Sequence, residues 1–407
     1  MRVGAVLPLL AALAALSLLL LGAQAQRATP LYNIVVRAAD SACLEVPVSL
    51  TIPRRLGGAL GPILRQVEPP ADLPCQAQDV GDRVKLTWIV RDLPQGESRQ
   101  YQLRFSAEVL QPLGVQLTEA DGVAEVKIGD QLFTRYITNA GPKPYCWPII
   151  GPTGLPVTRS YPMKDDVEGE AKDHPHQRSF WFTHGEVNGV DFWAEGPGKG
   201  KQVHREFEAL DGGSVYGLIR ASNDWIAPDA KKVCEDVREL RIYNVQNGRL
   251  LDFEITIKAT EGPVEFGDTK EGTLGFRVAE TMRQDRGGHI RNSEGQQDGD
   301  CWAKRAAWVD YYGPVGDETV GIAILESPQN FRYPTYWHVR TYGLYAVNPF
   351  GLRDFIGDKT GQGRYTIAQG GSLTLRYRIY IHKGDTEQAK VAQGFATYAH
   401  PPEVQVR

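Results

Sequence analysis

Histidine and arginine recur at close spacing near the middle of the chain. The densest stretch covers residues 173–193 and begins with the letters DHPHQRS. If His174 and His176 lie in extended backbone, which Pro175 favours, their rings point to one face and Arg178 joins them. Imidazole serves as acid, base or metal ligand near neutral pH, and guanidinium binds carboxylates or hydroxyl-rich ligands. The alternative is that these side chains only satisfy buried backbone groups in a crowded loop.

A second stretch repeats the His-x-Arg spacing far along the chain. Residues 332–343 read RYPTYWHVRTYG, and NPFG follows at 348–351. Strand alternation places Tyr336, His338 and Arg340 on one face, so two distant segments are predicted to line one cleft. The alternative is two unrelated solvated strands. It fits the composition less well, because large aromatic side chains are rarely left in water without a role.

A third stretch, residues 287–295, reads GGHIRNSEG and is typical of a loop. Glu294 is a candidate acid or base there, because a carboxylate beside a histidine is a common pair for proton transfer. A single acid on an exposed loop can equally be only solvated. Trp302 and Arg305 follow closely, and six of the eight histidines and six of the eight tryptophans lie within residues 174–338.

Several motifs, taken in order, resemble the PmoA-like family of exported bacterial proteins, which carries the name methane oxygenase PmoA. They are YP at 161, DHPHQRS at 173, NGVDFW at 188, NSEG at 292 and WHVR with NPFG at 337–351. The resemblance covers about residues 120–400. The family pattern has a further histidine where this chain has Gln177, so a role that the family's histidine plays at this position is not expected in this chain. Methane oxidation is rejected, because the subunit of that name is an integral membrane protein and no segment after residue 26 reaches roughly 18 consecutive apolar residues.

The resemblance and the clusters together define the predicted site. The predicted catalytic residues are His174, His176, His184, Glu294 and His338. The predicted substrate-binding residues are Arg178, Asn188, Asp191, Trp193, Trp302, Tyr336, Arg340 and Asn348. A divalent metal ion is a possible cofactor, with His174, His176 and His338 as its candidate ligands.

The elements that must position these residues are predicted to be strands. Leu251, Phe253, Ile255 and Ile257 alternate with charged or polar residues, and the same period of two recurs from Leu373 to Ile381. The 43 glycines and 26 prolines supply the turns of an all-β chain. One C-terminal helix is expected.

That helix is predicted to begin at Asp385 as its N-cap, with Gln388 reaching back in a capping box. The fold predicted for the rest is a small N-terminal β-sandwich over residues 26–115, followed by a large antiparallel β-supersandwich over residues 120–405. By analogy alone, the larger part is similar to galactose mutarotase.

The first 25 residues predict a cleavable secretory signal, with an apolar run from Val3 to Leu21 and an A-x-A exit that ends at Ala25. An uncleaved membrane anchor is the alternative. After cleavage we expect no membrane span and a periplasmic or extracellular location. A net charge of −4 gives no basic patch, so nucleic acid is not an expected partner.

Five cysteines are an odd number for an exported chain, so at least one is expected to stay unpaired. Cys43 and Cys75 are the first candidates for a disulfide bond because they share the N-terminal segment. Neither they nor the other cysteines have the spacing of a zinc motif.

These observations favour an exported carbohydrate-active protein that binds a glycan or another small polar ligand. In one hypothesis it is an enzyme, a hydrolase, lyase or epimerase, with histidines as acid, base or metal ligands and tryptophans stacked on the sugar. In the other, the same residues bind a glycan at the cell surface and transform nothing.

Overall fold

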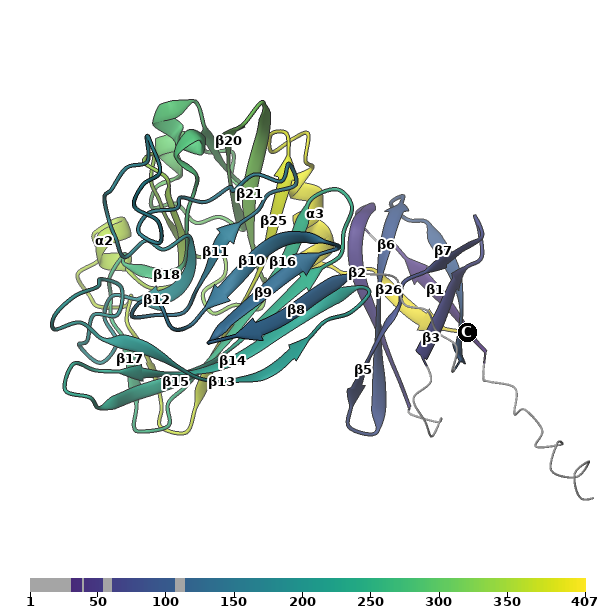
Figure 1. Cartoon of the computed structure of the whole chain (residues 1–407), viewed down its shortest axis with the longest axis horizontal. Coiled ribbons are helices and arrows are strands. Elements are labelled where there is room, and N and C mark those ends of the chain that lie inside the picture. Colours follow the sequence, from purple (N-terminus) through teal and green to yellow (C-terminus); the bar gives the residue numbers. More distant parts are fainter. Residues whose placement is uncertain (1–30, 39, 54–60, 107–113) are drawn as a thin grey trace, which may run out of the picture.

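The computed structural model describes residues 31–38, 40–53, 61–106 and 114–407, so the predicted signal at 1–25 lies outside the described part. Strands dominate it, and the predicted all-β fold with large antiparallel sheets is confirmed. Figure 1 shows a small sandwich beside a larger body, with α3 between them. None of the helices in the described part is long and apolar enough to cross a membrane.

The small sandwich pairs a five-stranded sheet, in the order β26-β1-β7-β3-β4, with a three-stranded sheet, β2-β6-β5. Trp88 and Tyr101 pack edge to face inside it. The last strand of the chain returns to this sandwich and pairs with its first strand. The bounds are β1 Tyr32–Arg37, β2 Cys43–Pro53, β3 Gly61–Gln66, β4 Ala71–Leu73, β5 Gln76–Val80, β6 Arg83–Leu93, β7 Ser98–Ser106 and β26 Glu403–Val406.

The larger body consists of two eight-stranded antiparallel sheets, here called sheet 1 and sheet 2, with a small pair β17-β24 beside them. Sheet 1 has the order β22-β23-β18-β12-β11-β10-β9-β8, and sheet 2 the order β13-β14-β15-β16-β25-β21-β20-β19. The bounds in sheet 1 are β8 Val115–Ala120, β9 Val123–Ile128, β10 Gln131–Ile137, β11 Tyr145–Ile149, β12 Phe180–His184, β18 Gly272–Arg277, β22 Tyr336–Val339 and β23 Leu344–Asn348. Those of the other strands are β13 Lys201–Asp211, β14 Tyr216–Ile226, β15 Lys232–Tyr243, β16 Arg249–Lys258, β17 Val264–Phe266, β19 His289–Asn292, β20 Trp308–Val315, β21 Glu318–Glu326, β24 Tyr365–Ile367 and β25 Ser372–Lys383.

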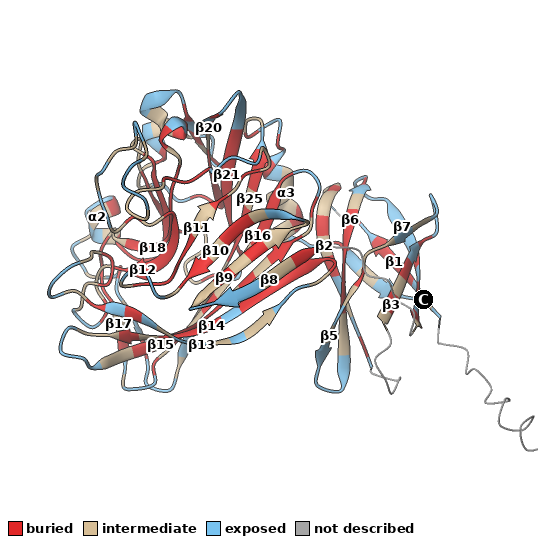
Figure 2. Cartoon of the chain, viewed as in Figure 1, coloured by how far each residue is buried: buried red, intermediate tan, exposed pale blue. Residues whose placement is uncertain are grey.

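One hydrophobic core lies between sheets 1 and 2 because their strands alternate with a period of two. Leu251, Phe253 and Ile255 of β16 point into this core. On the opposite face of the same strand, Asp252 and Glu254 pair with arginines of β25. Figure 2 shows that buried residues are frequent in the strands of the larger body, whereas exposed residues lie mostly in its loops. Each sheet therefore has an outer face where polar and aromatic residues can gather.

The C-terminal helix α3, Val391–Ala399, starts six residues later than its predicted N-cap. The capping box itself is present, because Asp385 Oδ1 accepts the Gln388 N–H and Gln388 Oε1 accepts the Asp385 N–H. A turn intervenes at 386–390, and Lys390 ends it with a left-handed φ of +55°. A short helix α2, Leu352–Ile356, and three 3-10 turns at Glu280–Met282, Gln284–Arg286 and Asp298–Cys301 complete the described elements.

The predicted bond between Cys43 and Cys75 does not form, and all five cysteines are free and buried. Cys43 pairs with Leu93 at one end of β6. Cys75 precedes Gln76, which pairs with Thr87 near the middle of that strand. This register separates the two cysteines by ~15 Å or more, which is beyond bridging distance. Burial raises the pKa of both thiols, to about 11 for Cys43 and about 12 for Cys75, so they stay protonated.

Candidate functional site

The outer face of sheet 1 carries the second predicted stretch. Trp337 and Val339 of β22 point into the core, so Tyr336 and His338 point outward, and Arg340 follows them on the same side. Beside them lies a second apolar group, which includes Trp181 of β12 and Trp193 of the segment that follows β12. Strand alternation alone accounts for this placement.

His338 is buried, with 2% of its surface exposed. Its Nδ1 lies 2.9 Å from the Lys270 carbonyl oxygen and donates to it, since a carbonyl can only accept. Burial, and next the Arg340 guanidinium, lower the pKa of His338 to about 3. The ring is therefore neutral at physiological pH, and its Nε2 is left as a hydrogen-bond acceptor.

The loop that precedes β12 brings two more histidines to this face. The rings of His174 and His176 lie 5.7 Å apart. His174 stacks on Tyr342 at 5.1 Å with an interplanar angle of 4°, and its Nδ1 lies 3.3 Å from Asp173 Oδ2. His176 lies 6.1 Å from the Trp193 ring, which in turn stacks against His338 at 6.4 Å.

The extended backbone predicted for this loop is wrong. The Gln177 N–H bonds to the His174 carbonyl, which closes a turn, and His174 has a φ of +44°. The cause is Arg159, whose fully buried guanidinium donates to the carbonyls of Ala171 and His174 and so draws the loop around itself. The histidine rings meet because this buried cation folds the loop, not because of period-two alternation.

We call the resulting group the histidine cluster. It comprises His174, His176, Trp193, Trp302, His338, Arg340 and Tyr342. Burial, and then the charge on Lys143, lower the pKa of His176 to about 4. The side chain of His174 is 42% exposed, which leaves it the most accessible imidazole of the three.

Arg340 lies 3.7 Å above the Trp302 ring, and within the described part of the chain it has no carboxylate partner. Trp302 also meets His338 edge to face at 5.0 Å and Phe355 of α2 at 5.4 Å. The Tyr336 ring stacks on the same Phe355 ring, with the ring centroids 5.5 Å apart. An aromatic surface with one unpaired guanidinium therefore borders the neutral imidazoles.

Each carboxylate that the structure places beside the cluster is engaged by a cation. Asp173 pairs with the buried guanidinium groups of Arg159 and Arg277, which hold its pKa low, at about 2. Glu195 accepts two bonds of 2.8 Å from Arg178 and one of 2.7 Å from Lys143. Burial lowers the pKa of Lys143 to about 8.

Arg178 is thus held by a carboxylate and lies over the Tyr145 ring, 5.4 Å from its centroid. Its predicted grouping with the two histidines depended on the extended backbone that the turn replaces. The guanidinium instead braces the segment around Glu195 through a bidentate pair. It positions Trp193, two residues before Glu195, rather than reaching the imidazoles.

Other predicted site residues lie away from the cluster. His184 is fully buried among Phe266 and Phe350, donates from Nε2 to the Gly267 carbonyl, and has its pKa lowered to about 4 by burial. Its Nδ1 faces Gly272, where any Cβ would lie 2.3 Å away. His184 therefore packs the core.

Three further polar residues hold turns. Asn188, with a φ of +49°, bonds the backbone of Glu265 and Pro263. Asp191 accepts the Trp193 N–H and pairs with Lys199. Asn348 is fully buried, donates to the Thr269 carbonyl and accepts the Phe350 N–H.

Glu294 is exposed on a turn, where its carboxylate bonds the Ser293 hydroxyl. It is therefore a solvated loop acid, the alternative raised for it above. Among the residues with described positions, no three His, Cys, Asp or Glu side chains are grouped so as to hold a metal ion.

Sequence reasoning missed Tyr342, Arg159 and Arg277. Tyr342 lies two residues after Arg340, so the alternation of that stretch could have found it. No local sequence pattern points to the two arginines, because they contact Asp173 from 14 and 104 residues away along the chain.

A model of DUF6807, a family of unknown function, matches residues 123–396, and the chain belongs to this family. No curated protein matches the sequence. The resemblance to the PmoA-like family stays a prediction.

Among solved structures, an alpha-mannosidase from Enterococcus faecalis V583 aligns at 10% identity with a TM-score of 0.41, covering 93% of this chain and 46% of the mannosidase. The chain thus spans less than half of that enzyme. A galactose mutarotase-like protein from Clostridium acetobutylicum aligns at 11% identity with a TM-score of 0.31, over 67% of this chain and 99% of its own. Another from Lactobacillus casei ATCC 334 aligns at 11% identity with a TM-score of 0.25, over 66% and 100%.

Proposed function

We propose that this DUF6807 member is a carbohydrate-active protein that binds a sugar at the histidine cluster. The observation that carries the proposal is the half-exposed His174, which stacks on Tyr342 and lies near the neutral His338, whose ring packs against Trp302. Aromatic faces stack on the apolar side of a sugar ring, while imidazole nitrogens and a free guanidinium bind hydroxyl groups. Arg340 supplies that guanidinium.

The three imidazoles divide the work. His338 Nε2 accepts a hydrogen bond from a sugar hydroxyl, because Nδ1 is committed to Lys270. His174 is the acid or base, since it is the accessible ring and Asp173 lies 3.3 Å from its Nδ1. In that role Nε2 takes a proton from the substrate and returns it later in the cycle, as in a lyase or an epimerase.

Hydrolysis by two carboxylates fits the cluster less well. That mechanism needs one acid to donate a proton and a second to act as base or nucleophile. Asp173 and Glu195 are each held by two cations, and Glu294 is on a separate turn. The same pairing of acids favours the second candidate, a protein that binds glycans without transforming them.

Sugar binding and turnover by the full chain separate these candidates. Titration of neutral and acidic oligosaccharides measures affinity, and chromatography of the incubated sugars measures products. For the enzyme we expect His174→Asn to abolish product while affinity changes less than about threefold, as for loss of a group that acts only in the transition state. His289→Asn is the matched control, because His289 is exposed and outside the cluster.

Wild-type protein that binds a sugar but forms no product from any member of the panel supports the binding candidate. Wild-type protein that binds no sugar at all contradicts the proposal in both forms. Retention of turnover by His174→Asn removes His174 from the mechanism.

We also propose that the protein acts outside the cytoplasm, on the basis of the predicted signal at residues 1–25. Expression of the whole chain in a Gram-negative host should release a form that begins at Gln26. N-terminal sequencing of the periplasmic fraction tests this, and an intact Met1 in the cytoplasm contradicts it.

A further inference from the structure

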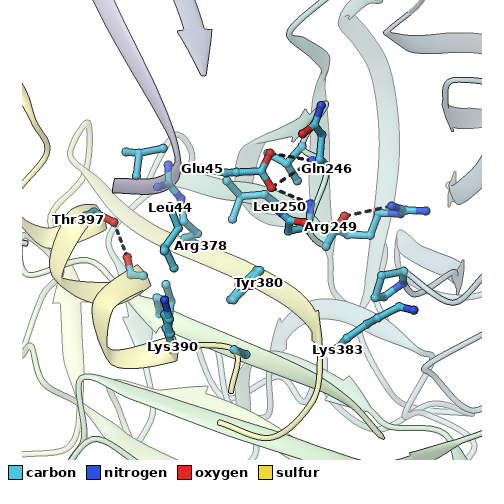
Figure 3. A pocket seen from close by; sticks show the side chains of 18 of the residues that line it. Leu44, Glu45, Gln246, Arg249, Leu250, Arg378, Tyr380, Lys383, Lys390 and Thr397 are labelled. Carbon is cyan, nitrogen blue, oxygen red and sulfur yellow. Dashed lines mark hydrogen bonds between the residues drawn. The ribbon is translucent and has the colours of Figure 1, made fainter. Parts of the chain in front are cut away.

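A cavity of about 580 Å³ lies between the small sandwich and the outer face of sheet 2. We call it the interdomain cavity. Its walls come from β2, the loop before β16, the outer side of β25 and the segment that leads into α3 (Figure 3). Small-molecule sites in proteins commonly have volumes of ~300–1,000 Å³ and often lie at domain interfaces. The cavity is on the opposite sheet from the histidine cluster.

The walls of this cavity are fixed by contacts between the two bodies. Glu45 of β2 accepts the backbone N–H groups of Gln246 and Asn247 and also pairs with Arg91 at 2.9 Å. From α3, Gln393 donates to the Ala42 carbonyl at 2.8 Å. The cavity is therefore a built feature of the interface, and the Glu45 carboxylate is already fully engaged.

The lining of the cavity is predominantly basic. Arg378 is neutralised by Asp252, with bonds of 2.6 and 2.8 Å, and Lys383 is paired with Glu318 at 2.9 Å. Arg249 and Lys390 also line it, and within the described ranges neither has a carboxylate partner. The acids of the lining are Glu45, which is engaged by Arg91, and the exposed Asp92, so the two cations without a carboxylate partner outnumber the one remaining acid.

Arg249 is the buried cation of the cavity that has a hydrogen-bond donor without a partner among the described residues. Only 9% of its surface is exposed, its Nη1 donates to the adjacent Gly248 carbonyl at 3.0 Å, and its Nε has no partner. A buried guanidinium with unused donors carries a desolvation cost that an oxyanion would offset by a charge-assisted, bidentate pair. Tyr380 lies between Arg249 and Lys390 in the view of Figure 3 and offers an aromatic face.

We infer that the interdomain cavity binds a small organic anion of about monosaccharide size, whose carboxylate or phosphate group pairs with Arg249. Lys390 at the exposed side attracts the anion, and the Tyr380 ring packs against its carbon skeleton. This site is independent of the sugar site proposed above. Its occupant would bridge the sandwich and sheet 2 and hold the two bodies together.

Calorimetric titration of the full chain at low salt tests this inference. The probes are D-glucuronate, glucose 6-phosphate and, as the neutral control of the same size, glucose. We expect the two anions to bind more tightly than glucose. The anion with the higher affinity shows whether the cavity prefers a carboxylate or a phosphate group. Arg249→Gln should weaken anion binding on the order of tenfold or more, while Arg65→Gln, on an exposed arginine of β3, should leave it unchanged.

If Arg249→Gln fails to fold, as judged by circular dichroism, Lys390→Gln serves in its place with an expected loss of about threefold. The inference is overturned if neither anion binds wild-type protein, if glucose binds as tightly as the anions, or if the folded variants bind like wild type. His338→Asn should leave anion binding intact, so failure here is distinct from failure of the proposed sugar site.

Discussion

The histidine cluster and the interdomain cavity lie on the outer faces of opposite sheets, and each has one guanidinium without a carboxylate partner among the described residues. Arg340 in the cluster is half-buried and lies on Trp302, which partly satisfies it through its ring face. Arg249 in the cavity is buried and has an unpartnered Nε. We therefore expect an anion to gain more binding free energy at Arg249 in the cavity than at Arg340 in the cluster.

The two regions also differ in what can move a proton. The cluster contains three imidazoles, two of them kept neutral by burial. The lining of the cavity includes no histidine among the described residues, and burial raises the pKa of Tyr380 to about 12, so this tyrosine keeps its proton near neutral pH. The chemistry of the cluster suits turnover, whereas that of the cavity suits binding alone. Four variants test this division, in order of expected effect.

The largest effect is expected for Arg159→Met. Its fully buried guanidinium holds Asp173 and the carbonyls of the cluster loop, so its loss leaves them unpaired. We expect the free energy of unfolding in urea to fall by about 3 kcal/mol and sugar binding to be lost, with anion binding retained by the folded fraction. Arg65→Met, on an exposed arginine, should change stability by less than about 0.5 kcal/mol. Equal stability of the two variants would refute the role of Arg159.

This loop marks the limit of what sequence predicts. The alternation of β22 and β25 fixes which side chains point outward, because a period of two leaves only one face for the core. It correctly predicts that Tyr336 and His338 share a face. The turn at His174 depends on Arg159 and Arg277, which act through tertiary contacts that no local pattern reveals.

The interdomain cavity was not predicted for a similar reason. Its lining comes from the loop at 245–248 and residues 378–397 of the larger body and from β2, which reaches them only because the sandwich docks there. Arg249 reads in the sequence as an ordinary polar residue at the start of a strand. Its burial and its missing partner are properties of the interface, so only the structure identifies it.

The second prediction concerns acid. The pKa of His338 is lower in the folded protein than its value of ~6.5 in the unfolded chain. The unfolded chain therefore takes up a proton first as the pH falls below ~6.5, and the free energy of unfolding decreases. Between pH 7 and pH 5, wild type should lose about 2 kcal/mol of unfolding free energy relative to His338→Asn, whose amide does not titrate. Denaturant curves at both pH values measure this difference. A difference that does not change with pH contradicts a buried, neutral His338.

The third prediction separates the ligands of the two regions. Trp302→Leu removes the ring on which Arg340 lies and against which His338 packs. Sugar affinity should fall about tenfold, or ~1.4 kcal/mol, through the loss of aromatic stacking. Anion binding at the cavity should be unchanged, and Arg249→Gln should show the reverse pattern. If each variant weakens both ligands equally, the two regions form one site.

The smallest effect is expected for a rise in pH, which acts through His382 and changes ligand binding at the interdomain cavity alone. Buried His382 pairs with Asp310 at 3.1 Å, while Asp310 also accepts the Thr386 hydroxyl at 2.6 Å and so fixes the turn that leads to Lys390. Desolvation of His382 acts against its charge, but Asp310 outweighs it and raises the pKa of His382 above the ordinary value. A raised folded pKa gives stability that is complete below ~6.5 and is lost as pH rises through the folded value.

Relative to His382→Gln, wild type should therefore lose stability on raising the pH from about 6.5, by less than the acid effect at His338. Anion affinity should weaken over the same range because the turn before α3 loosens, and sugar affinity should not. Calorimetry of both ligands across this range tests the prediction. The opposite signs of the acid and alkaline effects follow from one physical difference: His338 is buried with only a carbonyl partner, whereas His382 is buried against a carboxylate.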